Sequence, residues 1–382
     1  MAEPQRTQPP VLMLVVDPGR PSAAAGSYAA IASAGQGLLA AELSRRMAAA
    51  GAIVSRLQVP AQRLASFQWG AWFAAAARAA RREQHAAGVT VETIGYAGAG
   101  ALALLGDEAL SELLSPAAGE VVANNRFSAD AFAVAGDLDA ALDALAGCAT
   151  DNAAVRCLEE AGFASRDLAG AEWSRFDVDT PLDLALLRLA TRLPGTRVLD
   201  GMVTAFLEQT VLPTGAQLEV PHLEAVGEVV RSRDGQLLVA GRIPSSAWAY
   251  LETQSACRVR CYIEERGMRS SRDHVPRSLL ADWATRLGPA DLIGELATLA
   301  DAVILDSRVL MAARAGSSDA GDWPAEEERF ASDFGDTQRV TTGWLAELTA
   351  ASAEASIPFL VGGHALVSDG LRVLVDAAWL GR

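Results

Sequence analysis

The chain has 382 residues, 51% of them hydrophobic and 21% charged, which provides for a sizeable core and excludes an intrinsically disordered protein. Its 47 acidic and 32 basic residues give a net charge of −15, which argues against a surface that binds nucleic acid or an anionic membrane. A chain of this length is expected to form two domains.

Every basic residue is Arg, and the sequence contains no Lys. Together with the excess of Ala, this composition indicates a GC-rich bacterial genome. It has one chemical consequence. A phosphate contact that other proteins give to Lys must here come from Arg, from backbone N–H groups or from a metal ion.

The N-terminus and the cysteines bear on localisation. Residues 1–10 are polar and rich in Pro, which predicts a flexible end, and the apolar run 11–16 is too short for a signal or a membrane span. Cysteines stand at 148, 157, 257 and 261 without a zinc-binding pattern. We therefore expect a cytoplasmic protein with buried free thiols.

Short apolar runs alternate with longer Ala-rich segments through the first half. Strands are predicted at 11–16, 53–59, 89–96, 120–125 and 163–168, and helices at 28–50, 69–86, 107–114, 153–161 and 182–193. This alternation predicts an α/β domain over residues 11–196, with a mostly parallel sheet and helices on both faces.

The second half repeats the alternation after a predicted linker helix and turn at 197–220. Strands are predicted at 237–241, 258–264, 302–306 and 358–362, and helices at 245–252, 278–287, 290–299, 342–353 and 369–380. Residues 315–328 are polar and contain Gly and Ser, which predicts a mobile insert. We expect a second, smaller α/β domain over 221–382, of unknown role.

The most informative stretch closes the first domain and reads Phe-Asp-Val-Asp-Thr-Pro-Leu-Asp-Leu from position 176. In an extended segment Asp177 and Asp179 point to the same side, an arrangement that suits Mg²⁺ with phosphate oxygens. The alternative is structural: Thr180, Pro181 and Asp183 are ordinary helix-start signals, and the acids would then cap and solvate a strand–helix junction.

This run resembles the end of the α/β unit in nucleotidyltransferases of the MobA-like class, and the 2-phospholactate guanylyltransferase-like members are nearest. The resemblance implies a GT-A or Rossmann-like fold for the first half and transfer of a nucleoside monophosphate with Mg²⁺. It further implies that Asp177 and Asp179 hold the metal, with Thr180 beside them. The Gly turn at 95–100 would then face the nucleotide.

The sequence departs from that family at two places. The family's phosphate loop after the first strand has no clean match in Asp17-Pro18-Gly19-Arg20, and its earlier metal-binding Asp is missing from the turn at 95–100. A complete transferase site normally uses both to neutralise phosphoryl charge.

Other polar residues follow predicted strands in the first half, where open α/β sheets bind ligands. Gly98 and Gly100 are candidates for backbone contacts to phosphate, although a tight turn needs Gly equally often. Asn124, Asn125 and Asp130 are candidates for the acceptor side, with turn formation and capping as the alternative. The Asp-Asn pair at 151–152 is more typical of a helix cap.

The second half offers weaker candidates. His364 follows two glycines between a predicted strand and helix, where it is either a ligand-facing imidazole or a buried or capping residue. Asp306 and Arg308 follow another strand, and Arg308 is either an anion contact or half of an internal salt bridge.

Two hypotheses follow from the sequence. The first is an Mg²⁺-dependent nucleotidyltransferase-like enzyme that joins a nucleoside monophosphate from NTP to a small phosphate-bearing acceptor. The second is a catalytically degenerate regulatory protein of the same fold that binds a nucleotide or metabolite. The expected partners are a nucleotide and a small phosphorylated metabolite, and no residue indicates an oligomeric state.

Overall fold

The computed structural model describes residues 10–17, 24–59, 67–168, 171, 173–266 and 275–380. Most of the N-terminal segment predicted to be flexible, and the loop that follows the first strand, lie outside these residues. Contacts divide the chain into two units, and the first comprises Met1–Pro21 and Gln36–Asp177. The second comprises Ser22–Gly35 and Val178–Arg382. None of the described helices is long and apolar enough to cross a membrane.

The first unit is built on a six-stranded sheet with the order β2-β1-β3-β5-β4-β6. All neighbouring strands are parallel except at β5, which runs antiparallel to both β3 and β4. The sheet is therefore mixed, and the α/β architecture predicted from the sequence is present. The strands are β1 (Val11–Asp17), β2 (Ile53–Gln58), β3 (Thr93–Gly98), β4 (Glu120–Ala123), β5 (Ala131–Ala135) and β6 (Ala164–Asp167).

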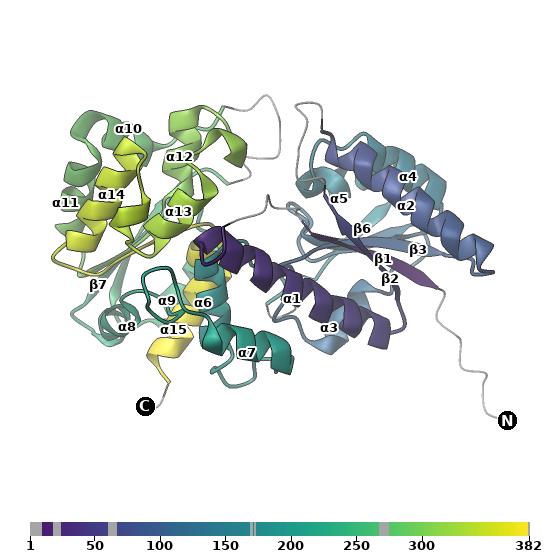
Figure 1. Cartoon of the computed structure of the whole chain (residues 1–382), viewed down its shortest axis with the longest axis horizontal. Coiled ribbons are helices and arrows are strands. Elements are labelled where there is room, and N and C mark those ends of the chain that lie inside the picture. The colour runs from purple at the N-terminus through teal and green to yellow at the C-terminus, as the bar shows by residue number, and fades with distance from the viewer. Residues whose placement is uncertain are drawn as a thin grey trace. The chain divides into compact units, whose positions relative to one another are not determined.

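Helices cover both faces of this sheet (Figure 1). One face buries Leu12, Ile94 and Phe132 against α2 (Trp69–Ala86), α4 (Leu138–Ala146) and α5 (Ala154–Glu160). The other face buries Met13 and Val15 against α3 (Asp107–Leu113) and the part of α1 (Tyr28–Ala49) that follows Gln36. Successive β1 residues enter opposite cores because strand side chains alternate, which explains why this strand is apolar throughout.

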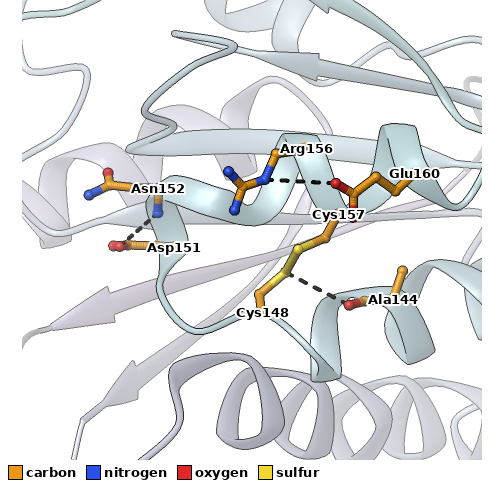
Figure 2. Close-up of a disulfide and its surroundings, with 7 residues drawn as sticks. All are labelled: Ala144, Cys148, Asp151, Asn152, Arg156, Cys157 and Glu160. Atoms are coloured by element: carbon orange, nitrogen blue, oxygen red, sulfur yellow. Dashed lines mark hydrogen bonds and ion pairs between the residues drawn. A yellow bond between two sulfur atoms is a disulfide. The ribbon is translucent and has the colours of Figure 1, made fainter. Parts of the chain in front are cut away.

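A disulfide joins Cys148 and Cys157, with their Cα atoms 6.5 Å apart (Figure 2). The prediction of free thiols is therefore wrong for this pair, because the fold brings the end of α4 and the middle of α5 together at a distance that a disulfide spans. Cys257 and Cys261 are free, as expected, but only half-buried. The disulfide closes a short segment that carries Asp151 and Asn152 (Figure 2).

The second unit contains a four-stranded sheet with the order β10-β9-β7-β8, and all its neighbouring strands are parallel. The predicted second α/β domain is thus present. Its strands are β7 (Gln236–Gly241), β8 (Arg258–Ile263), β9 (Ala302–Asp306) and β10 (Phe359–Gly362).

Two groups of helices pack on opposite faces of this sheet (Figure 1). In one group α15 (Asp369–Ala378) contacts α6 (Pro181–Ala190), α8 (Leu223–Arg231) and α9 (Ser245–Gln254). In the other group α11 (Pro289–Ala297) contacts α10 (Leu279–Leu287) and α14 (Gly343–Glu354). The remaining described α-helices of this unit are α7 (Gly201–Gln209), α12 (Arg308–Ala315) and α13 (Glu326–Asp333).

The first turn of α1 belongs to the second unit. The backbone N–H groups of Tyr28 and Ala29 donate to the carboxylate of Glu327 on α13, at 3.1 and 2.9 Å. The hydroxyl of Tyr28 donates to Asp336, and its ring stacks on Phe334. A carboxylate is a favourable partner for these amides because the N-terminus of a helix carries partial positive charge.

The boundary between the units differs from the one predicted. The sequence places residues up to 196 in the first domain, whereas contacts assign everything from Val178 to the second unit, which is also the larger of the two. The reason is packing: α6 is apolar on nearly its whole surface and contacts α15 and α7. The predicted insert at 315–328 overlaps the last residue of α12, Ala315, and the first three residues of α13.

Candidate functional site

Polar residues gather at one edge of the first unit's sheet. The parallel strands β1, β3, β4 and β6 all end there, and β5 begins there because it runs antiparallel. Asn124 therefore follows β4 at the same edge where Asp130 precedes β5 and where β3 ends at Gly98. Ligands of open α/β sheets bind beyond the carboxyl ends of the strands.

Asn124 is fully buried and organises the turn between β4 and β5. Its Oδ1 accepts from the backbone N–H groups of Asp130 and Ala131, both at 3.0 Å. Its Nδ2 donates to the Asp130 carboxylate at 3.2 Å and to the Ser174 carbonyl at 3.1 Å. Asn125 likewise accepts from the backbone of Phe127. Both amides therefore have structural partners, and Asp130 is held beside them.

Tyr96 of β3 brings three carboxylates into one electrostatic environment. Its hydroxyl donates to Asp151 at 2.9 Å, on the segment that the disulfide closes (Figure 2). Burial, then the negative charges of Asp151, Asp130 and Asp177, raise the pKa of Tyr96 well above its ordinary value. The structure thus places Asp130 and Asp177 near the same phenol, at the carboxyl edge of the sheet.

The glycines at the end of β3 do not present unused amides. The N–H of Gly98 donates to the Asp130 carbonyl at 2.9 Å, and the next residue, Ala99, donates to the Val16 carbonyl at 3.0 Å. Gly100 is buried in the following turn. A phosphate at this turn would have to displace bonds that the fold already makes.

The segment with Asp177 and Asp179 has no regular secondary structure, but its burial alternates. Phe176, Val178 and Thr180 are buried, while Asp177 is half-buried and Asp179 is exposed. This alternation has the period of two that the sequence predicts for an extended segment. Asp177 ends the first unit, and Asp179 lies in the second.

Thr180 caps α6, as the alternative interpretation of the sequence holds. Its side chain accepts from the N–H of Asp183, and the Asp183 carboxylate accepts from the N–H groups of Thr180 and Asp179 at 2.8 and 3.0 Å. Asp183 is 2% exposed, and within the described part of the chain its Oδ1 has no hydrogen-bond partner. Burial and the charge of Asp179 raise the pKa of Asp183 to about 7.

The candidates of the second half also gather at a sheet edge. Asp306, at the end of β9, is fully buried and forms a bidentate ion pair with Arg242, which follows β7. Arg308 is buried and pairs with Asp333 through two bonds of 2.7 and 2.6 Å, which is the internal salt bridge weighed above. His364 is exposed, and Arg242 and Asp306 both affect its pKa.

Among the described residues, no three His, Cys, Asp or Glu side chains form a group that could hold a metal ion. Mg²⁺ sites in nucleotide enzymes commonly use one or two carboxylates together with substrate phosphates. Near Tyr96 in the first unit, Asp151 accepts from the phenol and Asp130 accepts from Asn124, while Asp177 adds a third negative charge.

Comparisons with known proteins add no family: no protein-family model matches this chain, and no curated protein matches it either.

Sequence reasoning gave no role to Tyr96 or Arg242 and assigned Asp151 to capping. Tyr96 lies within a strand whose pattern gives no functional signal. Asp151 is 55 residues from Tyr96, so only the fold reveals their contact. Arg242 carried a usable signal, because it directly follows a strand that ends in Gly241.

Proposed function

We propose that the first unit binds Mg²⁺ and a nucleoside triphosphate and transfers the nucleoside monophosphate to a small phosphate-bearing acceptor. The observation that carries this proposal is the gathering of Asp130, Asp151 and Asp177 around Tyr96 at the carboxyl edge of the sheet. The resemblance of the Asp-x-Asp-Thr-Pro run supports the same reaction.

Each residue has a role in this proposal. Asp130 and Asp177 would hold Mg²⁺, which would neutralise charge on the phosphate groups of the nucleotide. Tyr96 holds Asp151, which together with the disulfide fixes the segment before α5. In the reaction an acceptor oxygen bonds to the α-phosphorus, the bond from that phosphorus to the bridging oxygen breaks, and pyrophosphate leaves.

A second candidate is binding without transfer. It is favoured by the amides of Gly98 and Ala99, which bond to backbone carbonyls, and by Asn124, whose hydrogen-bonding groups are all used within the turn. A protein with this site would hold a nucleotide or metabolite as a regulatory ligand.

The deciding experiment measures thermal stability and pyrophosphate release with ATP, GTP, CTP and UTP, each with and without Mg²⁺. A ligand at a hundred times its dissociation constant stabilises the fold by about 2.7 kcal/mol. We expect this shift with one nucleotide, only with Mg²⁺, and its loss in Asp177→Asn and Asp130→Asn. Asp143→Asn, an exposed acid on α4 paired with Arg78, is the matched control.

The outcomes separate the candidates. Pyrophosphate release in the presence of a phosphorylated acceptor supports transfer. A Mg²⁺-dependent shift without release from any acceptor supports the regulatory alternative. No shift with any of the four nucleotides refutes transfer and also refutes a regulatory site for one of these nucleotides.

A further inference from the structure

The strand order of the second unit creates a topological switch point between β7 and β9. The chain passes from β7 to its neighbour β8 on one side, then returns across β7 to β9 and β10 on the other. Connections on the two sides of such a point diverge, which leaves the carboxyl ends of the two central strands open to a ligand. The residues placed there are Arg242 after β7 and Asp306 at the end of β9.

The fold brings these two strand ends unusually close. Gly241 has a φ of +131°, and a Cβ atom at this position would lie 2.3 Å from the Cβ of Asp306. The Arg242 Nε then donates to Asp306 Oδ2 at 2.6 Å, and Nη2 donates to Oδ1 at 3.0 Å. The buried carboxylate thus fixes one edge of the guanidinium group in a defined orientation.

The other edge of the Arg242 guanidinium is unused. Within the described part of the chain its Nη1 has no hydrogen-bond partner, and the side chain is 17% exposed. Arg308 is the useful contrast, because both of its terminal nitrogens bond to Asp333 and its side chain is only 7% exposed. Of these two arginines, Arg242 is the one with donors left for a ligand.

His364 adds a second group to the same place. Loss of water around the imidazole and the positive charges of Arg242 and Arg266 lower its pKa to about 4, and Asp306 offsets only part of this effect. Part of the His364 surface is nevertheless exposed. The lowered pKa of His364 indicates that the electrostatic potential around the imidazole is positive, although the whole chain has a net charge of −15. An anion bound there would be stabilised by this potential.

The first turn of α9 offers further donors three residues after Arg242. Its N-cap is Pro244, which provides no side-chain cap, and Ser245 and Ser246 are exposed at the first two helical positions. The N–H groups of a first helical turn have no intrahelical acceptors and bind phosphate oxygens well. The guanidinium edge, the imidazole and this turn are each suited to the oxygens of a phosphate group.

We propose that the switch point of the second unit binds the phosphate group of a small phosphorylated metabolite, with Arg242 Nη1 and His364 as direct contacts and the hydroxyl and backbone N–H groups of Ser245 and Ser246 as supporting donors. This site is separate from the nucleotide site proposed for the first unit and does not depend on it.

The test follows the imidazole resonances of the full chain by NMR while inorganic phosphate is added, with His364→Gln identifying the signal. We expect saturable shifts of the His364 resonance and a rise of its pKa by about one unit at saturation, because an anion stabilises the imidazolium form. A parallel titration with acetate tests whether the site responds to any carboxylate as strongly as to phosphate. No saturable shift with phosphate, or an equal response to acetate, overturns the proposal.

Variants locate the binding. Arg242→Lys keeps a positive charge beside Asp306 but loses the Nη1 donors, so we expect phosphate affinity to fall about tenfold. Arg258 is the first residue of β8, at the end of the strand away from the proposed site. Arg258→Lys is therefore the matched control, and we expect it to leave the affinity for phosphate unchanged. If Arg242→Lys does not fold, the double variant Ser245→Ala with Ser246→Ala takes its place, with an expected loss of about threefold. Wild-type affinity in the folded variant that is tested overturns the assignment.

Discussion

The buried carboxyl of Asp183 makes stability depend on pH, and Asp183→Asn removes that dependence. The pKa of Asp183 rises from 3.8 to about 7 on folding, so the folded chain holds this proton more tightly than the unfolded chain does. Its contribution to stability is fully present below about pH 4 and is lost as pH rises to about 7. A shift of this size corresponds to about 4 kcal/mol in the free energy of unfolding.

The assay compares urea unfolding of wild type and Asp183→Asn from pH 4 to pH 8. Because Asn does not titrate, we expect the stability of wild type relative to the variant to fall by about 4 kcal/mol across this range. Thr180→Ala is the matched control, since it removes the other half of the same capping box at a cost of about 1 kcal/mol but keeps the titrating carboxyl of Asp183. A difference between wild type and Asp183→Asn that stays constant with pH would refute the reasoning.

Three further changes test the packing. Gly241 has a positive φ, and Gly241→Ala places a methyl group against a buried aspartate, so we expect the free energy of unfolding from chemical denaturation to fall by about 3 kcal/mol. Gly37→Ala, in an open position of α1, is the control and is expected to be neutral or stabilising by up to about 1 kcal/mol. Cys148→Ser opens the disulfide loop, whose sequence separation is 9, and we expect a loss of about 2.6 kcal/mol; unchanged stability under non-reducing conditions would contradict this. Asp333→Asn leaves Arg308 buried without its carboxylate, with an expected loss of about 3 to 5 kcal/mol, and a melting temperature equal to wild type would show that the pair is not stabilising.

Much of the secondary structure follows from the sequence because its signals are local. The helix predicted at 69–86 and the strand at 302–306 have the observed bounds. The capping box at Thr180 also follows from residue types alone, since Pro181 and Asp183 stand at the positions that a helix start favours.

Two of the elements that sequence reasoning missed lack such signals. β5 is an Ala-Phe-Ala-Val-Ala run in an Ala-rich chain, and its apolar residues show neither clear alternation nor helical spacing. α12 follows β9 after Ser307 alone, so no turn residues separate strand from helix. In a chain this rich in Ala, neither β5 nor α12 stands out from its neighbours in the sequence.

The candidate sites depend on contacts between distant residues, which no local pattern contains. Tyr96 and Asp151 are 55 positions apart, and Arg242 and Asp306 are 64 positions apart. The sequence marked Asp306 because it ends a strand, but its partner became visible only when the order of β7 and β9 was known. The same limit applies to the disulfide, which needs the packing of α4 against α5.

The segment Ser22–Gly35, which lies between parts of the first unit in the sequence but belongs to the second, has a practical consequence for dissecting the protein. No single cut yields two complete halves. A fragment from Val178 onward lacks Tyr28, whose backbone and hydroxyl bond to Glu327 and Asp336. To isolate the second unit, residues 22–35 must therefore be fused through a linker to the fragment that begins at Val178.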